Sequence, residues 1–326
     1  MAKYKILSRK AFSLVEISIV ILVIGIIIAS VTQGREILFD SKIKSAQNLT
    51  NKSVVNNIYN LAFWYETSMD ESFTKDENNQ GVNITKWQDI NPQSNIKYHA
   101  YAGQNSSATN FYYTIFSGNV SGPEYIKNGI NNLPTLRFDN SGSNNRFVAV
   151  DPRIRNQKGK SFTFFMVVKY NSGDGNFLDR SCLNASNVSV ECGSAVTAGR
   201  PLFSANIDSN RIIHMFFRSQ SNQGPGYFST NHTLNYDQSF ILTMQRNYNR
   251  NITTYINGVK SSNNPSENTG PILFDAFKIG AHAQSDQEIN IDISEVIFFN
   301  DKIKTLDRKA VESYLSQKYN IKINHN

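Results

Sequence analysis

A run of twenty residues from Phe12 to Val31 is almost entirely apolar and contains a single carboxylate, Glu16. As an α-helix, this run would be about 30 Å long, which is the thickness of the hydrocarbon core of a bilayer. Basic residues precede the run, so the N-terminus is expected in the cytoplasm and the rest of the chain outside it. The sequence therefore predicts one transmembrane helix over residues 12–31.

Glu16 is the residue that a plain membrane anchor does not explain. An unpaired charge inside a membrane costs several kcal/mol, so an intramembrane carboxylate is a functional hypothesis in its own right. A cleaved secretory signal peptide is the other simple reading. The apolar run is longer than an ordinary signal-peptide core, and no small-x-small cleavage site follows it.

The segment from Lys10 to Glu16, KAFSLVE, followed by an unbroken apolar helix, resembles the prepilin leader of type IV pilins and type II secretion pseudopilins. The resemblance implies that a prepilin peptidase removes residues 1–11 by cutting between Ala11 and Phe12. The same enzyme would then N-methylate Phe12. The family usually has Gly before the cut, whereas this chain has Ala11, which is also small.

The resemblance also implies a role for Glu16 in filament assembly. Its carboxylate would pair with the new terminal amine at Phe12 of a neighbouring subunit, because stacking is how a buried charge finds its partner. A single such pair would also fix the axial register. The implied partners are the prepilin peptidase/N-methyltransferase, other pilin or pseudopilin subunits and an inner-membrane assembly platform. The implied location is the bacterial inner membrane, with the globular part in the periplasm or on the cell surface in a filament.

Beyond Val31 the pattern becomes amphipathic, and the helix is expected to continue to about residue 55. Apolar and small residues recur every three to four positions among polar ones: Ile37, Ile43, Ala46, Thr50, Val54 and Ile58. We therefore assign residues 1–11 to the leader, 12–58 to the pilin-like helix with its amphipathic part at 32–58, and 59–326 to a globular domain.

From about Leu61 the periodicity becomes that of short strands. Apolar or alternating segments separated by turn signals predict an antiparallel β-sandwich or jelly roll. The clearest are LAFWYET, PTLRFD, RFVAV, SFTFFMVVKY, RIIHMFFRS, SFILTMQRN, ITTYINGVKSS, FDAFKIGAH and INIDISEVIFFN. Asn257-Gly258 predicts a tight hairpin, and the nearly continuous apolar strand SFTFFMVVKY suits the middle of a sandwich.

The C-terminal segment predicts one helix that packs on the sandwich. Thr305 is the candidate N-cap. The expected apolar face consists of Leu306, Ala310, Val311, Tyr314 and Leu315. The fold class is thus α+β, mainly β: a long N-terminal transmembrane and stalk helix, an antiparallel β-sandwich and a C-terminal helix.

The order of these segments over residues 61–322 resembles the concanavalin A-like, laminin G-like lectin/glucanase domains. The resemblance is carried by Trp64, W87QDI, LPTLRFD, FTFFMVVK, TYINGVKSS, FKIGA and ISEVIFFNDKI, which leads into AVESYLSQKYNI. That family includes sugar binders, protein binders, hydrolases and modules that only hold a shape, so a glycan or protein ligand is implied without being identified.

The segment NIDISE, Asn290 to Glu295, resembles the catalytic strand of laminarinase-type glycosidases. Retaining hydrolysis needs two carboxyl groups about 5 Å apart. Asn290 stands where the nucleophile is expected, and an amide cannot form the glycosyl-enzyme intermediate. Asp292 and Glu295 are therefore expected to be ordinary residues of a strand, and the chain is not expected to be an enzyme.

Cys182 and Cys192 lie close together among Ser, Asn and Gly. If the domain is exported, they predict a disulfide, which would stabilise the fold by roughly 3 kcal/mol. Asp174, Asn176 and Asp179 could offer oxygens to calcium, but without a complete calcium loop an ordinary turn is favoured and no cofactor is expected.

Several other candidate side chains are expected to have structural roles. Trp64, Trp87 and Tyr227 could stack on a sugar, although aromatic residues of a sandwich usually belong to its core. His214 lies in an alternating strand and is expected to be packed or hydrogen-bonded. Four of the net seven positive charges precede Ala11, and no basic stripe with interleaved aromatics remains, so nucleic acid is not an expected partner.

The function that these observations favour is that of a minor pilin-like or pseudopilin-like subunit, which displays a lectin-like domain for adhesion or substrate recognition. Two alternatives remain open. One is a membrane-tethered glycosidase of the same fold, and the other is a signal-anchored lectin that never assembles.

Overall fold

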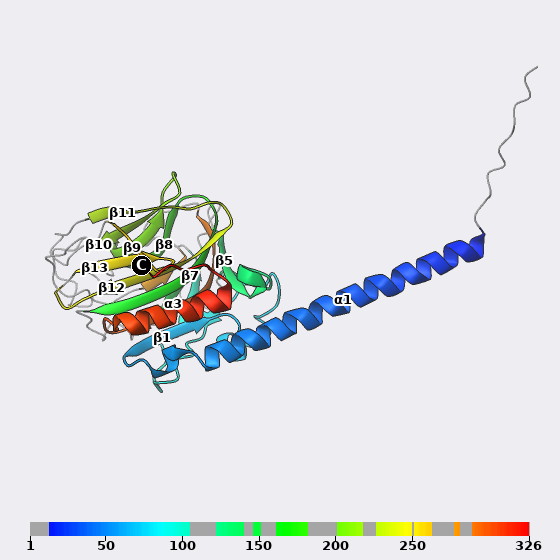
Figure 1. The fold of residues 1–326 in the computed structure, drawn as a ribbon, viewed down its shortest axis with the longest axis horizontal. Coiled ribbons are helices and arrows are strands. Elements are labelled where there is room, and N and C mark those ends of the chain that lie inside the picture. The colour runs from blue at the N-terminus through cyan, green and yellow to red at the C-terminus, as the bar shows by residue number, and fades with distance from the viewer. Residues whose placement is uncertain are drawn as a thin grey trace, which may run out of the picture. The chain divides into compact units, whose positions relative to one another are not determined.

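The structure is a computed structural model that describes residues 13–104, 122–139, 146–150, 161–181, 201–217, 226–249, 251–262, 277–280 and 289–325. The chain divides into two compact units, residues 1–45 and residues 46–326. The first is helical, and the second contains two antiparallel sheets and a C-terminal helix (Figure 1). The predicted fold class is confirmed.

Helix α1, Leu14–Asn51, is 38 residues long. Its first part is long and apolar enough to cross a membrane, and none of the most apolar window is buried. The helix was expected to reach about residue 55, and it ends four residues earlier. The short 3-10 helix η1, Val54–Asn57, then leads to the first strand, and the hydroxyl of Ser53 caps η1 by accepting a hydrogen bond from Val55 N.

The first sheet has eight strands in the order β14-β13-β12-β7-β16-β5-β4, with β1 also paired to β16. Their bounds are β1 Leu61–Glu66, β4 Glu124–Ile126, β5 Thr135–Asp139, β7 Phe162–Ser172, β12 Gln238–Arg246, β13 Ile252–Ile256, β14 Val259–Lys260 and β16 Asn290–Phe299. As predicted, β7 lies inside the sheet, between β12 and β16, and most of its residues are buried.

The second sheet also has eight strands, in the order β11-β10-β9-β8-β15-β6-β3-β2. Their bounds are β2 Lys86–Trp87, β3 Ala100–Gln104, β6 Arg146–Val150, β8 Gly175–Ser181, β9 Pro201–Ile207, β10 Ile212–Phe217, β11 Gly226–Thr233 and β15 Phe277–Ile279. Two further 3-10 turns, η2 Asp70–Ser72 and η4 Ile130–Asn132, lie in the connections.

The core of the second unit is one cluster of buried apolar side chains contributed by both sheets. Alternate residues of β7, such as Phe164 and Met166, meet Phe203 and Ala205 from β9 in this cluster. The facing sheets therefore form a sandwich, because each buries one apolar face against the other.

The Asn257-Gly258 hairpin between β13 and β14 is confirmed. Both residues have positive φ, 51° and 78°, which is the backbone geometry that this two-residue turn requires. The Asn257 side chain accepts a hydrogen bond from Ile241 N at 2.8 Å, so the turn is also fastened to β12.

Helix α3, Thr305–Tyr319, packs on the outer side of the first sheet (Figure 1). Two details of its prediction are wrong. Thr305 is the first helical residue, and the cap is Lys304, which makes no side-chain capping bond. Leu306 is 80% exposed, whereas Val311 and Leu315 are buried as expected. The buried face of the helix already includes Arg308 in its first turn, and Leu306 lies off that face.

We expect Gly258→Ala to destabilise the globular unit by about 2 kcal/mol in chemical denaturation. A Cβ atom at Gly258 would combine a positive φ with an approach of 2.8 Å to the carbonyl oxygen of Asn324. Gly81→Ala is the matched control, because Gly81 has a φ of 80° but its Cβ would meet nothing closer than 3.6 Å. Equal losses for the two variants would contradict a role for the close approach.

Candidate functional site

The N-terminal end of α1 places Glu16 in a capping arrangement. The backbone N–H of Ser13 donates to Glu16 Oε2 at 2.8 Å, and Ser13 Oγ accepts from Val15 N–H at 3.3 Å. A carboxylate three residues after the N-cap satisfies an orphan amide and lies at the positive end of the helix dipole. The S-x-x-E spacing of Ser13 and Glu16 is the sequence signal of this capping arrangement.

The predicted cleavage and methylation residues, Ala11 and Phe12, lie outside the described part of the chain. The pairing of Glu16 with a neighbouring amine therefore stays a prediction. The same holds for the Cys182–Cys192 disulfide, since both cysteines also lie outside the described residues.

The last turns of α1 are built into the sandwich unit. Ala46 and Thr50 are buried, and Gln47 Nε2 donates to Ser68 O at 2.9 Å and to Asp70 Oδ1 at 3.1 Å. Thr50 Oγ1 accepts a hydrogen bond from the ammonium of Lys318 at 2.7 Å. The final turn of the helix is thus part of the fold of the domain, and it is more than a linker.

Lys318 Nζ lies at the centre of a buried polar group that joins four elements. Besides Thr50, it contacts Glu66 Oε2 of β1 at 2.8 Å and Glu295 Oε2 of β16 at 2.9 Å, and all three charged side chains are fully buried. We call this group the junction cluster. It consists of Thr50, Trp64, Glu66, Glu295, Tyr314, Lys318 and Tyr319.

Each carboxylate of the junction cluster accepts hydrogen bonds from several donors. Glu295 accepts from Trp64 Nε1 at 2.8 Å, from the hydroxyls of Tyr314 and Tyr319 at 2.9 Å each, and from Lys318. Glu66 accepts from Lys318, from the N–H and hydroxyl of Ser68 and from the N–H of Met69. Each carboxylate thus accepts four hydrogen bonds, which offsets part of the cost of burying its charge.

Burial and mutual interaction shift the pKa values of four members of the junction cluster: Glu295, Tyr314, Lys318 and Tyr319. Burial raises the pKa of Glu295, and the ammonium of Lys318 opposes this shift. Burial alone would lower the pKa of Lys318, but Glu295 and Glu66 outweigh it and raise the pKa above its ordinary value. Burial and the neighbouring carboxylates raise the pKa values of Tyr314 and Tyr319 well above the usual 10.0.

The NIDISE segment has a structural role in this fold. Glu295 is 1% exposed and is held by four donors, so a substrate cannot reach it. The carboxylate of Asp292 is fully buried and forms a two-pronged ion pair with Arg137 at 2.8 and 2.9 Å. Asn290 Oδ1 accepts from Asn171 at 3.0 Å. The expectation that Asp292 and Glu295 are strand residues agrees with this placement.

The other candidate binding residues of the sequence do not come together at one site. Trp64 and Trp87 are 1% and 0% exposed, so neither offers a surface to a sugar, and the side chain of Tyr227 lies outside the described residues. His214 Nε2 lies 3.0 Å from Asp208 Oδ2, in agreement with its expected hydrogen-bonding role.

The segment GDGNFLD was expected to be an ordinary turn, and this is only partly right. Asp174 is exposed in a turn, whereas Asn176 and Asp179 are buried in strand β8. Within the described ranges, no three His, Cys, Asp or Glu side chains gather where they could hold a metal ion.

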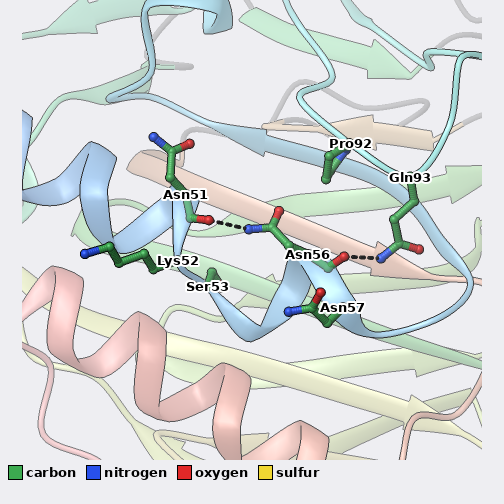
Figure 2. Close-up of a pocket in the computed structure, with 7 residues that line it drawn as sticks. All are labelled: Asn51, Lys52, Ser53, Asn56, Asn57, Pro92 and Gln93. Carbon is green, nitrogen blue, oxygen red and sulfur yellow. Dashed lines mark hydrogen bonds between the residues drawn. The ribbon is translucent and has the colours of Figure 1, made fainter.

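A polar hollow of about 440 Å³ lies where α1 ends (Figure 2). Asn56 Nδ2 donates to the carbonyl oxygens of Thr50 and Asn51 at 3.2 and 2.9 Å. Gln93 Nε2 donates to those of Asn56 and Ile58 at 3.1 and 2.7 Å. Figure 2 shows both amides turned toward the backbone. Asn56 satisfies carbonyl groups of the last turn of α1, and Gln93 satisfies carbonyl groups of and after η1, so the amides that line this hollow have a capping role.

A surface pair formed by Arg211 and Tyr236 was not predicted from the sequence. Tyr236, in the turn between β11 and β12, is 61% exposed, and the guanidinium carbon of Arg211 lies 5.2 Å from its ring centre. An aromatic residue between Asn235 and Asp237 in a turn is the available sequence signal. The pairing with Arg211 could not be read from the sequence, because the two residues lie in different turns.

No protein-family model matches the chain, and no curated protein sequence matches it either. Among solved structures, Trypanosoma rangeli sialidase in complex with sialic acid is 13% identical, with a TM-score of 0.44 over 79% of this chain and 33% of that one. The botulinum neurotoxin type G receptor binding domain is 13% identical, with a TM-score of 0.45 over 79% and 51%.

A structure described under cell entry of botulinum neurotoxin type C is 14% identical, with a TM-score of 0.49 over 80% of this chain and 52% of that one. The chain thus spans about a third of the sialidase and about half of the toxin chains. At these identities and TM-scores, the likeness carries no argument about activity or ligand.

We expect Lys318→Met to destabilise the globular unit by about 3–5 kcal/mol, because it leaves two buried carboxylates without their cation. Lys322→Met is the matched control. Lys322 is exposed, so the same substitution there should change stability by less than about 0.5 kcal/mol. Chemical denaturation of both variants measures the difference, and similar values for the two would contradict the role of the junction cluster.

We also expect stability to fall as the pH rises above about 10. The raised pKa values of Lys318, Tyr314 and Tyr319 mean that the unfolded chain releases these protons at a lower pH than the folded chain. Their contribution is present below the unfolded-state pKa values and is lost above them. Thermal unfolding between pH 8 and pH 11.5, roughly, measures this slope. Tyr319→Phe removes one titrating group and should flatten the slope, whereas a melting temperature that does not change with pH would contradict the prediction.

Proposed function

We propose that the chain is a pilin-like or pseudopilin-like subunit that displays a recognition domain outside the cytoplasm. The apolar part of α1 inserts in the inner membrane and then packs against copies of itself in a filament. The sandwich recognises a glycan or a protein on a cell surface or on a secretion substrate. The observation that carries this proposal is the uninterrupted helix Leu14–Asn51, exposed along its apolar part and built into the sandwich at its last turn.

The exposed apolar residues favour assembly over a plain anchor. A bilayer would cover residues 14–31, most of which are large and apolar. Ile37 and Leu38 are 68% and 72% exposed, and they lie about 9–10 Å beyond Val31 along the helix, outside the hydrocarbon core. Neighbouring copies of α1 in a filament would cover these two residues as well, which lipid tails alone would not.

The capping arrangement at Ser13 is compatible with the proposed role of Glu16. Removal of residues 1–11 would leave the Ser13 N–H in place and add a terminal amine at Phe12. Glu16 would then be the fifth residue of the mature chain, and in the membrane its remaining charge would be neutralised by the amine of a neighbouring subunit.

The tethered-glycosidase alternative has no support in the NIDISE strand, because its glutamate is buried in the junction cluster and its aspartate is paired with Arg137. The non-assembling anchored lectin shares the same helix and sandwich. It differs from the proposal in the processing of the N-terminus and in the need for Glu16.

Mass spectrometry of the mature N-terminus tests the proposal directly. We expect a chain that begins with N-methyl-Phe12. A chain that retains Met1 or Ala2 would overturn filament assembly and leave the anchored lectin.

A pair of variants tests the role of Glu16 in the same cells. Glu16→Leu should still insert in the membrane but should be absent from sheared filaments, because the neighbour's amine has no partner. Glu36→Ala is the control, since Glu36 is an exposed acid on the same helix beyond the membrane span. Wild-type levels of Glu16→Leu in filaments would refute the assembly role.

A further inference from the structure

Two turns of the sandwich come together at Tyr236. One joins β9 to β10 through Asp208–Arg211, and the other joins β11 to β12 through Asn235–Asp237. The backbone N–H of Leu234 donates to Arg211 O at 2.8 Å, which fixes one turn to the other. Because β10 belongs to the second sheet and β12 to the first, this surface bridges both layers of the sandwich.

The Tyr236 ring is held in place although most of it is exposed. It stacks on the ring of Tyr170 from β7, with ring centres 5.7 Å apart and planes inclined by 18°. Tyr170 is 1% exposed, and its hydroxyl donates to Gly173 O at 2.7 Å. An exposed aromatic ring supported by a buried one is a rigid platform, so a ligand that packs on it would order few side chains.

Arg211 adopts a backbone conformation that is unfavourable for arginine. Nine described non-glycine residues have positive φ, and eight of them are Asn or Asp, which tolerate it. Arg211, with a φ of 64°, is the exception. Backbone strain of this kind costs on the order of 1–3 kcal/mol and persists only where the surrounding structure over-determines it, as the hydrogen bonds of the Arg211 N–H to Asp208 O and of the Leu234 N–H to Arg211 O do here.

The charges around Arg211 are already paired with other groups. Asp208 accepts two backbone N–H groups and lies 3.0 Å from His214, and Asp237 pairs with Lys169 at 3.0 Å. No carboxylate of the described chain lies within ion-pair distance of the Arg211 guanidinium, which therefore presents its fork of donors beside the exposed ring.

We propose that Arg211 and Tyr236 bind an acidic saccharide, a sugar that carries a carboxylate. The guanidinium forms a two-pronged ion pair with the sugar carboxylate, and the apolar C–H face of the pyranose packs against the Tyr236 ring. The exposed amides of Asn210 and Asn235 border the platform and suit the sugar hydroxyls. This assignment rests on the proposed recognition function and names its ligand class.

The test measures binding of the full-length protein in detergent to surfaces coated with polygalacturonate, dextran sulfate or neutral dextran. We expect binding to polygalacturonate that weakens as salt is added. Tyr236→Ala and Arg211→Asn should each weaken it by about tenfold or more. Asparagine is chosen because it accepts the positive φ of position 211, so the turn is kept while the guanidinium is lost.

Two control variants separate this site from general surface effects. Tyr248→Ala removes another exposed tyrosine, 67% exposed in the turn after β12. Lys75→Asn removes one exposed positive charge elsewhere. Both should bind polygalacturonate like the wild type, and all four variants should keep the melting temperature of the wild type within a few degrees.

Equal losses in the control variants, or wild-type binding by Tyr236→Ala and Arg211→Asn, would overturn the site. Binding to dextran sulfate or neutral dextran but not to polygalacturonate would overturn the ligand class while leaving saccharide recognition standing. An absence of binding to all three surfaces would overturn the acidic-saccharide assignment. The N-terminal mass and the Glu16 variant test filament assembly independently of these results.

Discussion

The ammonium of Lys318 and the two carboxylates that face it hold together the parts of this chain that lie farthest apart in sequence. Thr50 belongs to α1, Glu66 to β1 and Glu295 to β16, and oxygen atoms of all three lie 2.7–2.9 Å from the ammonium nitrogen of Lys318 in α3. Burying three charges is unfavourable unless each finds its partners, and here each carboxylate accepts four hydrogen bonds. The junction cluster therefore draws on all four elements, and the loss of α3 would leave both buried carboxylates without their cation.

This requirement sets where the globular domain begins. The predicted boundary between residues 58 and 59 would separate Ala46 and Thr50 from the sandwich against which they are buried. It would also leave Gln93 without the carbonyl groups of Val55 and Asn56 that its amide satisfies. The end of α1 and η1 thus belong to the fold of the domain, and a soluble fragment that keeps this packing starts no later than Ala46.

Local patterns predicted much of the architecture, because each depends on neighbours in sequence. The apolar run up to Val31, the buried strand β7 and the Asn257-Gly258 turn all follow from spacing and residue type. The site could not be predicted in this way. Lys318 pairs with Glu66, 252 residues away, and its sequence context is that of an ordinary polar residue in a C-terminal helix. The Arg211–Tyr236 pair likewise arises only when two separate turns meet in the fold. Leu306 was misassigned because the buried face of α3 includes the charged residues Arg308 and Glu312, which apolar periodicity does not reveal.

The attachment of α1 at Thr50 also determines how the molecule would bear a mechanical load. Tension along α1 would enter the globular domain at the last helical turn, and the junction cluster around Lys318 would transmit it to β1 and β16. Strand β16 is hydrogen-bonded to β1, β5 and β7, so the force spreads into the interior of a sheet instead of peeling an outer strand. In the filament role proposed above, the globular domain would thus be pulled at a point that is tied to the interior of its sheet.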